Sequence, residues 1–303
     1  MSKIAYDPTK DKFARWIRRS RFLRTVFFKT LDLFFLRSWY VRSSLRILYR
    51  NMYSRPELIR KAQVQSTVRD RDTTRSEKWK ILDAGSGFGQ YDRFMLKAFP
   101  NAEIHAIDVK EDYLEDCRSY FRKEMADGRI HFDNHDLTGD ELPAEYYDLV
   151  VCVDVLEHIS EDVEVMKRVH GALRPGGFLV MHSPSHFSEE DAGEDEFFVD
   201  EHARAGYSKK ELMEKLQKSG MEPVSLQYSY GKWGHRAWVV LIKVPMLWFT
   251  RFGIITMIWL PLYYAFTLLP GVAMMWADHR NDNKRGTGIL GIARKPESFK
   301  QTS

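Results

Sequence analysis

Glycines and acidic residues alternate in one short stretch of this 303-residue chain, in a pattern that suits the binding of a small polar ligand. Residues 80–92 read K-I-L-D-A-G-S-G-F-G-Q-Y-D, with an apolar run that ends in Asp83. Three glycines follow at alternate positions: Gly85, Gly87 and Gly89. Glycine admits positive φ and lets the backbone approach a ligand without interference from a Cβ atom. The free amides of a helix that starts after such a turn can hold a polar or anionic group.

Three further acids stand at or just past the ends of later apolar runs: Asp108, Asp136 and Asp154. In a parallel sheet the strands end at a common edge, and open α/β sheets bind their ligands there. We therefore expect the three acids to lie near Asp83. A carboxylate at the end of the second strand is also placed to accept hydrogen bonds from both hydroxyls of a ribose.

Strand-like and helix-like patterns alternate from Trp79 onward, which predicts a parallel sheet with helices on its faces. The predicted strands cover residues 80–83, 102–109, 129–137, 147–153, 173–184, 222–230 and 287–294. The fourth strand runs directly into D-V-L-E-H at 154–158. Helices are expected at 161–172 and 209–218, the second capped by Ser208.

The spacing of the first motif differs from a dinucleotide fingerprint, which would place its third glycine at the position of Gln90. D-x-G-x-G-x-G instead resembles the first motif of class I S-adenosylmethionine-dependent methyltransferases, in the branch of the ubiquinone-biosynthesis O-methyltransferases and type 11 methyltransferases. The later motifs follow in the family's order over residues 79–230 and again at 286–295. The resemblance implies an α/β fold with a Rossmann-like class I methyltransferase sheet, and S-adenosyl-L-methionine as the cofactor.

The resemblance also implies roles for individual residues. The first motif would shape the methionine pocket through Asp83, Gly85, Ser86, Gly87 and Gly89. Asp108 would bind the ribose hydroxyls. Asp136 and Leu137 would frame the adenine, and Val109 would pack against its face. Asp154 would line the sulfonium side of the site.

A histidine is the expected base if the methyl acceptor is a hydroxyl. The cofactor carries the reactivity, so the protein has to hold donor and acceptor together, exclude water and remove a proton. Histidine suits proton removal near neutral pH. His158, which follows L-E as in ubiquinone-biosynthesis-like O-methyltransferases, and His202, in E-H-A-R-A-G-Y, are the two candidates. A surface or capping role is the alternative for each, and no metal site is predicted.

Two classes of nucleic-acid methyltransferase are disfavoured by the segment after the fourth strand. Amino methyltransferases of nucleic-acid bases carry Asn/Asp-Pro-Pro-aromatic there, and cytosine-carbon enzymes need an active cysteine. Residues 154–157 read D-V-L-E instead. The chain's two cysteines, Cys117 and Cys152, offer no disulfide framework or metal spacing, which suits a reducing compartment.

The first 78 residues differ from the rest in charge, because 20 Lys/Arg against 7 Asp/Glu give them a net charge of +13. The whole chain is +4, so the remainder carries −9. Within residues 1–64 apolar residues recur at helical spacing, with Arg42, Arg46 and Arg50 at four-residue steps. We interpret this region as basic amphipathic helices on an anionic membrane surface. The alternative is a helical cap that packs on the catalytic core.

A linker at residues 65–78 leads into the expected core at 79–235, and a second unusual stretch follows at 236–277. Its part from 252 to 277 has 26 residues without a formal charge, long enough to span a bilayer. Glycines and prolines interrupt it, and both of its ends must return to one sheet. A re-entrant or in-plane helical hairpin is therefore expected between strands six and seven, with a soluble lid or dimer interface as the alternative. Residues 278–303 would hold the last strand and a tail.

These features predict a membrane-peripheral methyltransferase on the cytoplasmic face of a membrane. The expected substrate is a lipophilic small molecule such as a quinone precursor, an aromatic polyene or a lipid, methylated at oxygen, with nitrogen and carbon as alternatives. Nucleic acid is not an expected partner. Two other functions stay open: a noncatalytic membrane adaptor on the same fold, and a soluble RNA methyltransferase.

Overall fold

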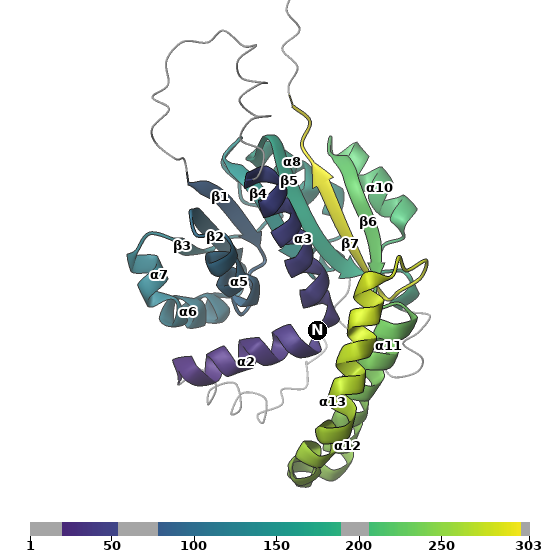
Figure 1. Ribbon diagram of the computed structural model, residues 1–303. Helices are drawn as coiled ribbons and strands as arrows, with labels where there is room; N and C mark the ends of the chain where they lie inside the picture. The colour runs from purple at the N-terminus through teal and green to yellow at the C-terminus, as the bar shows by residue number, and fades with distance from the viewer. Residues whose placement is uncertain (1–19, 54–77, 189–205, 298–303) are drawn as a thin grey trace, which may run out of the picture.

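The computed structural model describes residues 20–53, 78–188 and 206–297 (Figure 1). Its centre is a seven-stranded sheet in the order β3-β2-β1-β4-β5-β7-β6, in which β7 is antiparallel to both of its neighbours. The strands are β1 Trp79–Ala84, β2 Ala102–Asp108, β3 Ile130–Asn134, β4 Tyr147–Val153, β5 Leu173–Pro184, β6 Glu222–Ser229 and β7 Gly288–Arg294. The predicted α/β fold and its seven strands are confirmed.

Side-chain hydrogen bonds set the ends of two elements. The third strand is shorter than predicted and ends at Asn134, because the Asp136 carboxylate accepts hydrogen bonds from the amide and hydroxyl of Thr138, at 2.8 and 2.7 Å. Such Asx turns compete with an extended backbone. The predicted cap of the 209–218 helix is confirmed, since the Ser208 hydroxyl accepts the Glu211 amide at 3.1 Å.

Helices cover both faces of the sheet. Helices α5 (Gln90–Ala98) and α6 (Glu111–Tyr120) pack on one face, and the short α7 (Arg122–Ala126) follows α6. Helices α8 (Asp162–Ala172) and α10 (Lys209–Lys218) pack on the other face. The core therefore consists of two apolar layers, one on each side of the strands.

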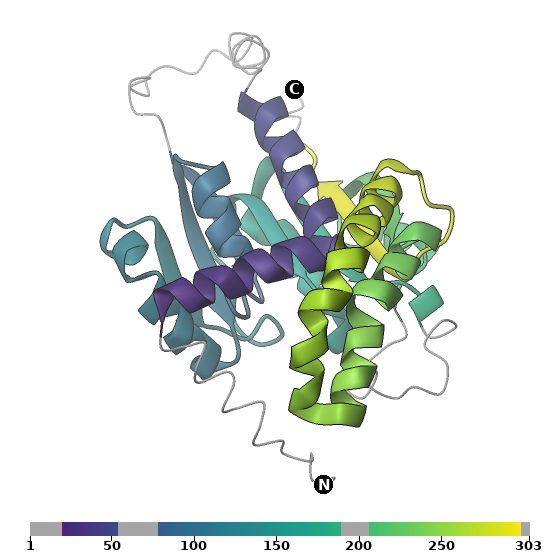
Figure 2. The same cartoon turned by 60° about the horizontal axis from the view of Figure 1, so that its bottom comes forward.

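Two N-terminal helices, α2 (Arg21–Phe34) and α3 (Leu36–Tyr53), join the core on the α5 face. Helix α2 crosses below the ends of the parallel strands, and α3 runs up along the sheet (Figures 1 and 2). Phe28 is fully buried, and its ring meets Tyr120 edge-on at 5.2 Å. The inner apolar side of this region thus contacts the core, as the helical-cap alternative has it, while Phe22 on the outer side is 73% exposed.

The stretch between β6 and β7 forms the predicted helical hairpin (Figure 1). Its first arm consists of α11 (Lys232–Trp238), a π-helical turn (Val239–Lys243) and α12 (Val244–Phe252). A 3-10 turn at Gly253–Ile255 reverses the chain, and α13 (Thr256–Arg280) returns to the domain. The reversal starts at Gly253, whose φ of 59° lies in the left-handed region that glycine adopts without strain.

Side chains of α13 hold the two arms together. The hydroxyls of Tyr263 and Tyr264 donate to the carbonyls of Val240 and Leu241, at 2.7 and 2.8 Å. These carbonyls lie in the π-helical turn, so the two hydroxyls join the arms at the irregular part of the first arm. Gly271 lets the arms approach closely, because a Cβ atom there would lie 2.5 Å from Leu241 Cγ.

The base of the hairpin is fixed to the domain by Asp278, which is fully buried. Its carboxylate accepts hydrogen bonds from the Gly234 amide at 2.8 Å, the Tyr40 hydroxyl at 3.0 Å and the Asn283 amide group at 3.2 Å. These donors come from the start of α11, from α3 and from the segment before β7. One carboxylate therefore joins the hairpin, the N-terminal cap and the sheet.

Candidate active site

The glycine turn after β1 lies at the carboxyl edge of the sheet. The amides of Gly85 and Ser86 both donate to the Ile107 carbonyl at 2.9 Å, which ties the turn to the end of β2. Gly85 has φ 87°, and a Cβ atom there would lie 2.3 Å from Val155 Cγ2. Gly89 has φ 77° at the N-cap of α5, and a Cβ atom there would meet a ring carbon at 2.7 Å. Only glycine fits these two positions.

Asp108 faces the glycine turn from the end of β2. Its carboxylate accepts hydrogen bonds from the Gly87 amide at 2.8 Å and from the Lys110 amide at 2.9 Å. These two bonds orient the carboxylate, and its oxygens keep lone pairs that can accept from a ligand hydroxyl. The structure thus places Asp108 beside the turn, and its role toward a ribose stays a prediction.

Two buried carboxyl groups, Asp83 and Asp92, lie beneath the turn, with 1% and 0% of their surface exposed. Burial raises the pKa of Asp83 to about 7, and the charge of Asp108 adds to the effect. Burial, and then the charge of Asp83, raise the pKa of Asp92 well above its ordinary value. Within the described residues no N–H or O–H group donates a hydrogen bond to either oxygen of Asp92. The two carboxyl groups can bond to each other only if one of them keeps its proton, as the raised pKa values indicate. Asp92 could not be identified from the sequence, because it occupies an ordinary polar position of α5.

Asp154 stands just past β4 with φ 53°, a conformation that costs a non-glycine residue about 1–3 kcal/mol and is concentrated at functional sites. Its carboxylate forms an ion pair with Arg37 at the start of α3 and accepts from His182 Nδ1 at 2.9 Å. Burial, and then the charge of Arg37, lower the pKa of His182 to about 3, so its ring is neutral. The Ser229 hydroxyl is 2.9 Å from His182 Nε2, which is left as an acceptor. Sequence reasoning missed Arg37, because only the packing of α3 brings it to this edge.

The residues expected around an adenine follow the ends of β2 and β3. Val109 is exposed, Leu137 is buried, and Asp136 is exposed with its carboxylate held by the turn described above. Phe88 belongs to the glycine turn, and the centroid of its exposed ring lies 4.4 Å from the centroid of the Tyr113 ring. Exposed apolar side chains at this edge are suitable partners for a flat aromatic ring.

The two candidate bases differ in what the structure shows of them. His158 ends the 3-10 turn Leu156–His158, and its exposed side chain lines a pocket of about 320 Å³ beside α8. His202 lies outside the described residues. The two segments that flank its loop come together at the carboxyl edge of the sheet, where Ser185 and Tyr207 form a β-bridge. The catalytic role of each histidine stays a prediction.

The corner between α2 and α3 closes over the glycine turn. Gln90 Nε2, in the first turn of α5, donates to Asp32 Oδ1 at 3.0 Å and to Ser38 Oγ at 2.8 Å. Asp32 also pairs with Arg42 at 2.8 Å and with Arg93 at 3.8 Å. These bonds make the N-terminal cap a part of the site's wall.

One group of potential metal ligands is assembled elsewhere on the sheet. Within the described residues Glu103, His105 and His131 hold ligand atoms within 4.8 Å of one another. The Lys80 ammonium lies 2.8 Å from the Glu103 carboxylate and already neutralises it. The group is better explained as an ion-pair cluster than as a metal site.

The glycine turn and its acids fit a ligand that carries an ammonium, a carboxylate and a ribose, as S-adenosylmethionine does. Ser86 Oγ is a buried polar atom without a hydrogen-bond partner in the described part of the chain. A buried polar group left unpaired costs about 1–3 kcal/mol, which a ligand that bonds to it would recover. With Asp108 near the same turn, polar ligand groups would find partners on β1, the turn and β2.

Comparisons with known proteins agree with this architecture. The family model described as Methyltransferase domain matches residues 82–179. A ubiquinone biosynthesis O-methyltransferase of Shewanella sp. is 31% identical over 100 residues, which are 33% of this chain and 41% of that protein. A malonyl-(acyl-carrier protein) O-methyltransferase of Halalkalibacterium halodurans is 28% identical over 117 residues, which are 39% of this chain and 43% of that protein. The chain thus spans less than half the length of these relatives.

Among solved structures, phosphoethanolamine N-methyltransferase 2 of Haemonchus contortus, in complex with S-adenosyl-L-methionine, aligns with a TM-score of 0.50 and 18% identity. The alignment covers 74% of this chain and 50% of that chain, and at this identity it shows the fold alone. The family match, the strand order with an antiparallel β7, and the glycine turn between the acids of β1 and β2 coincide in one domain. Residues 82–179 therefore form a methyltransferase domain, on the fold of the class I methyltransferases that use S-adenosyl-L-methionine as their cofactor.

Proposed function

We propose that this chain is a membrane-seated enzyme that transfers the methyl group of S-adenosylmethionine to an oxygen atom of a lipophilic small molecule. The observation that carries the membrane part is the exposed apolar surface of the α12–α13 hairpin. The helical run from Lys232 to Arg280 is long and apolar enough to cross a membrane, and only 6% of its most apolar window is buried. A core helix of a soluble protein would be covered along most of that window.

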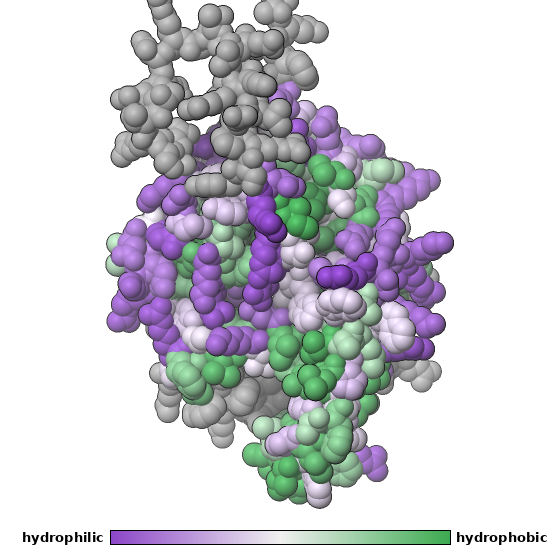
Figure 3. Space-filling model, viewed as in Figure 1, coloured by the Kyte–Doolittle hydropathy of each residue, from purple (hydrophilic) through white to green (hydrophobic). Residues whose placement is uncertain are grey.

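Large apolar side chains are exposed along both arms of the hairpin and at its tip. Phe252 on α12 is 54% exposed, Ile254 at the turn 80%, and Phe266 and Leu269 on α13 74% and 77%. In Figure 3 this end of the molecule carries a hydrophobic surface that projects away from the polar domain. Soluble monomers rarely expose a contiguous apolar patch of this kind, and a lipid environment would cover it.

The dimensions of the hairpin favour an in-plane position in the membrane surface. Helix α13 as a whole could cross a bilayer by length, but from Gly271 onward Gly271, Met275 and Asp278 are buried against the first arm and the domain, which leaves residues 254–269, about 24 Å at ~1.5 Å per residue, free to enter the hydrocarbon. A bilayer's hydrocarbon core is about 30 Å thick, so this part is too short to span it. Arg251 lies next to the tip, where deep insertion would cost about 2.5–3.5 kcal/mol for one guanidinium. A hairpin in the interface avoids both problems.

The hairpin leaves the domain on the side of the candidate site. In Figure 1 the parallel strands end toward the lower part of the view, where α2 crosses and the hairpin extends further. Figure 2 brings α2 and the hairpin forward together. A bilayer that holds the hairpin would therefore lie on the side to which the cofactor edge points, so a lipophilic acceptor would reach the site from the membrane.

The chain's own residues would hold donor and acceptor together and take up a proton. When bound, S-adenosylmethionine supplies an electrophilic methyl group on a sulfonium. Asp83 would accept the ammonium of its methionine part, and Asp108 would accept its ribose hydroxyls. The N-terminal cap would exclude water from the reacting atoms. His158 or His202 would remove the acceptor proton, and the names of both O-methyltransferase relatives support an oxygen acceptor.

Flotation with phosphatidylcholine vesicles tests the proposal. We expect the wild type to float and a triple variant, Ile254→Ser, Phe266→Ser and Leu269→Ser, to remain soluble. The matched control replaces exposed apolar residues on α10 and β6, Met213→Ser and Val224→Ser, and should float like the wild type. Cofactor affinity measured by calorimetry should be equal in all three proteins.

Other outcomes would point to the remaining functions. A wild type that stays soluble in the presence of vesicles contradicts the membrane seat, and salt-sensitive RNA binding by that protein would favour an RNA methyltransferase. Flotation without any binding of S-adenosylmethionine at millimolar concentration would favour a noncatalytic adaptor.

A further inference from the structure

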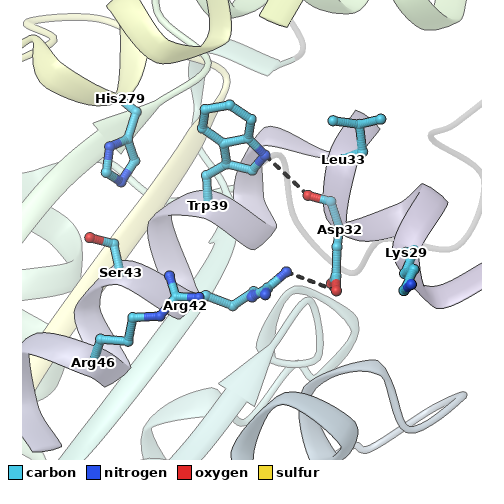
Figure 4. A pocket seen from close by; sticks show the side chains of 8 residues that line it. All are labelled: Lys29, Asp32, Leu33, Trp39, Arg42, Ser43, Arg46 and His279. Atoms are coloured by element: carbon cyan, nitrogen blue, oxygen red, sulfur yellow. Dashed lines mark hydrogen bonds and ion pairs between the residues drawn. The ribbon is translucent and has the colours of Figure 1, made fainter. Parts of the chain in front are cut away.

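A groove lined by basic side chains opens between α2, α3 and the end of α13, apart from the glycine turn and its acids (Figure 4). Its volume is about 510 Å³. The side chains that decide its chemistry are Lys29, Asp32, Leu33, Trp39, Arg42 and Arg46. Asp32 and Arg42 also hold the cap on the glycine turn, but the proposed methyl transfer gives no role to Lys29, Leu33, Trp39 or Arg46.

Positive charge exceeds negative charge in this groove. Asp32 is the one acid among the described lining residues, and Arg42 already pairs with its carboxylate at 2.8 Å. Lys29 and Arg46 form no ion pair within the residues that the structure describes. Burial lowers the pKa of His279, whose ring therefore adds no charge at neutral pH. Three cations against one carboxylate leave two positive charges without a counter-ion.

The two guanidinium groups are held in place before any ligand binds. Arg42 and Arg46 lie one turn apart on α3, and both stand over the ring of Phe94, at 4.7 and 5.0 Å from its centroid. Trp39 Nε1 donates to the Asp32 carbonyl at 3.1 Å, which fixes the opposite wall (Figure 4). An anion between the guanidinium groups would offset their repulsion, and each group presents paired N–H donors that match phosphate oxygens.

The helices that form the groove also expose apolar side chains. On α2, Phe22, Val26 and Leu33 are exposed, and Lys29 stands between them on the same stripe of the helix. On α13, the exposed ring of Trp276 lies one turn before the end of the helix. A helix that presents apolar residues and a lysine on its outer stripe suits a membrane interface, where lipid phosphates are the nearest anions.

We propose that this groove binds the phosphate group of an anionic membrane lipid, with Lys29 and Arg46 as its free donors. The inference rests on the membrane seat proposed above and adds a specific headgroup site to it. Arg50 offers a matched control, because it continues the four-residue repeat of Arg42 and Arg46 on α3 and is exposed but does not line the groove.

The test uses full-length protein and dihexanoylphosphatidylglycerol below its micelle concentration, so that no membrane surface is present. Calorimetry should show binding by the wild type and at least tenfold weaker binding by the Lys29→Gln, Arg46→Gln double variant, because each substitution removes a charge-assisted donor. Arg50→Gln should bind within twofold of the wild type. Inorganic phosphate should bind more weakly than the lipid. All three proteins should bind S-adenosylmethionine equally, which shows that they are folded.

Three results would overturn the proposal: no binding of the lipid by the wild type, equal affinity in the double variant, or inorganic phosphate that binds as tightly as the lipid. The last would identify a site for a free anion. Flotation on phosphatidylcholine vesicles separates this inference from the proposed function. A protein that binds the soluble lipid but does not float supports the groove and contradicts the hairpin's seat, and the reverse result contradicts the groove alone.

Discussion

At the scale of single residues, the site depends on acids whose surroundings decide what they can bind. Asp108 is oriented by two backbone amides, and we predict that it holds the cofactor ribose. Loss of hydrogen bonds to a charged group costs about 1.5–3 kcal/mol each, so Asp108→Ala should weaken S-adenosylmethionine binding at least tenfold in calorimetry. Asp112→Ala, an exposed acid at the start of α6, is the matched control and should bind normally. Equal affinity of the two variants would show that the ribose lies elsewhere.

The buried pair of Asp83 and Asp92 predicts a particular dependence of stability on pH. The folded pKa of Asp83, about 7, lies above its ordinary value of 3.8, so the folded state retains a proton that the unfolded chain releases. The stability that this proton contributes is complete below about pH 4 and is lost as the pH rises through about 7. Urea denaturation should therefore show a lower free energy of unfolding at pH 8 than at pH 5.

Asp92→Asn tests the origin of that slope. The amide group can donate to Asp83 without a bound proton, so the variant should be about 1–3 kcal/mol more stable than the wild type at pH 8 and should show a flatter pH profile. Asp112→Asn serves as the exposed control. A variant that keeps the wild-type slope would place the titrating group elsewhere.

At the scale of elements, helix α2 is part of the fold and not a detachable arm. Phe28 is fully buried against Tyr120, whereas Phe22 on the same helix is 73% exposed. Phe28→Ala should lower the free energy of unfolding by about 3–5 kcal/mol, because it removes a buried ring and leaves a cavity. Phe22→Ala should change it by no more than about 0.5 kcal/mol. Thermal or urea denaturation of both variants checks this, and equal small effects would mean that the cap is only loosely attached.

The elements themselves could be predicted from the sequence, because local signals specify them. Apolar runs indicated the strands, Ser208 indicated a helix start, and the return of both ends of the apolar stretch to one sheet indicated a hairpin. The acids at the strand ends were also identifiable, since a parallel sheet brings those ends together.

Contacts between distant segments could not be predicted in the same way. Arg37 reaches Asp154 only because α3 packs on the sheet, and Asp92 becomes a buried partner of Asp83 only when α5 docks. Amphipathicity alone does not say whether a membrane or the protein core covers the apolar side of the basic helices, and the sequence therefore predicts membrane contact for it. For the described residues, the core covers it.

At the scale of the whole molecule, the cofactor edge, the outer side of α2 and the hairpin point in one direction (Figures 1 and 2). The basic groove opens between the last two. This arrangement gives the methyltransferase domain one side that suits a membrane, and in the view of Figure 3 hydrophilic residues cover most of the domain's flanks away from the hairpin. Under the proposed function, a lipophilic acceptor would be taken from the bilayer and methylated close to it.

The most direct test of this account follows the methyl group. Purified protein is incubated with methyl-labelled S-adenosylmethionine and, in separate reactions, with the lipid extract, the water-soluble metabolites and the RNA of its source cells. The account predicts label in an organic-soluble product of the lipid reaction, and its loss with Asp108→Ala. Label that appears only in RNA or in water-soluble products, or no transfer to any fraction by a protein that binds the cofactor, would contradict it.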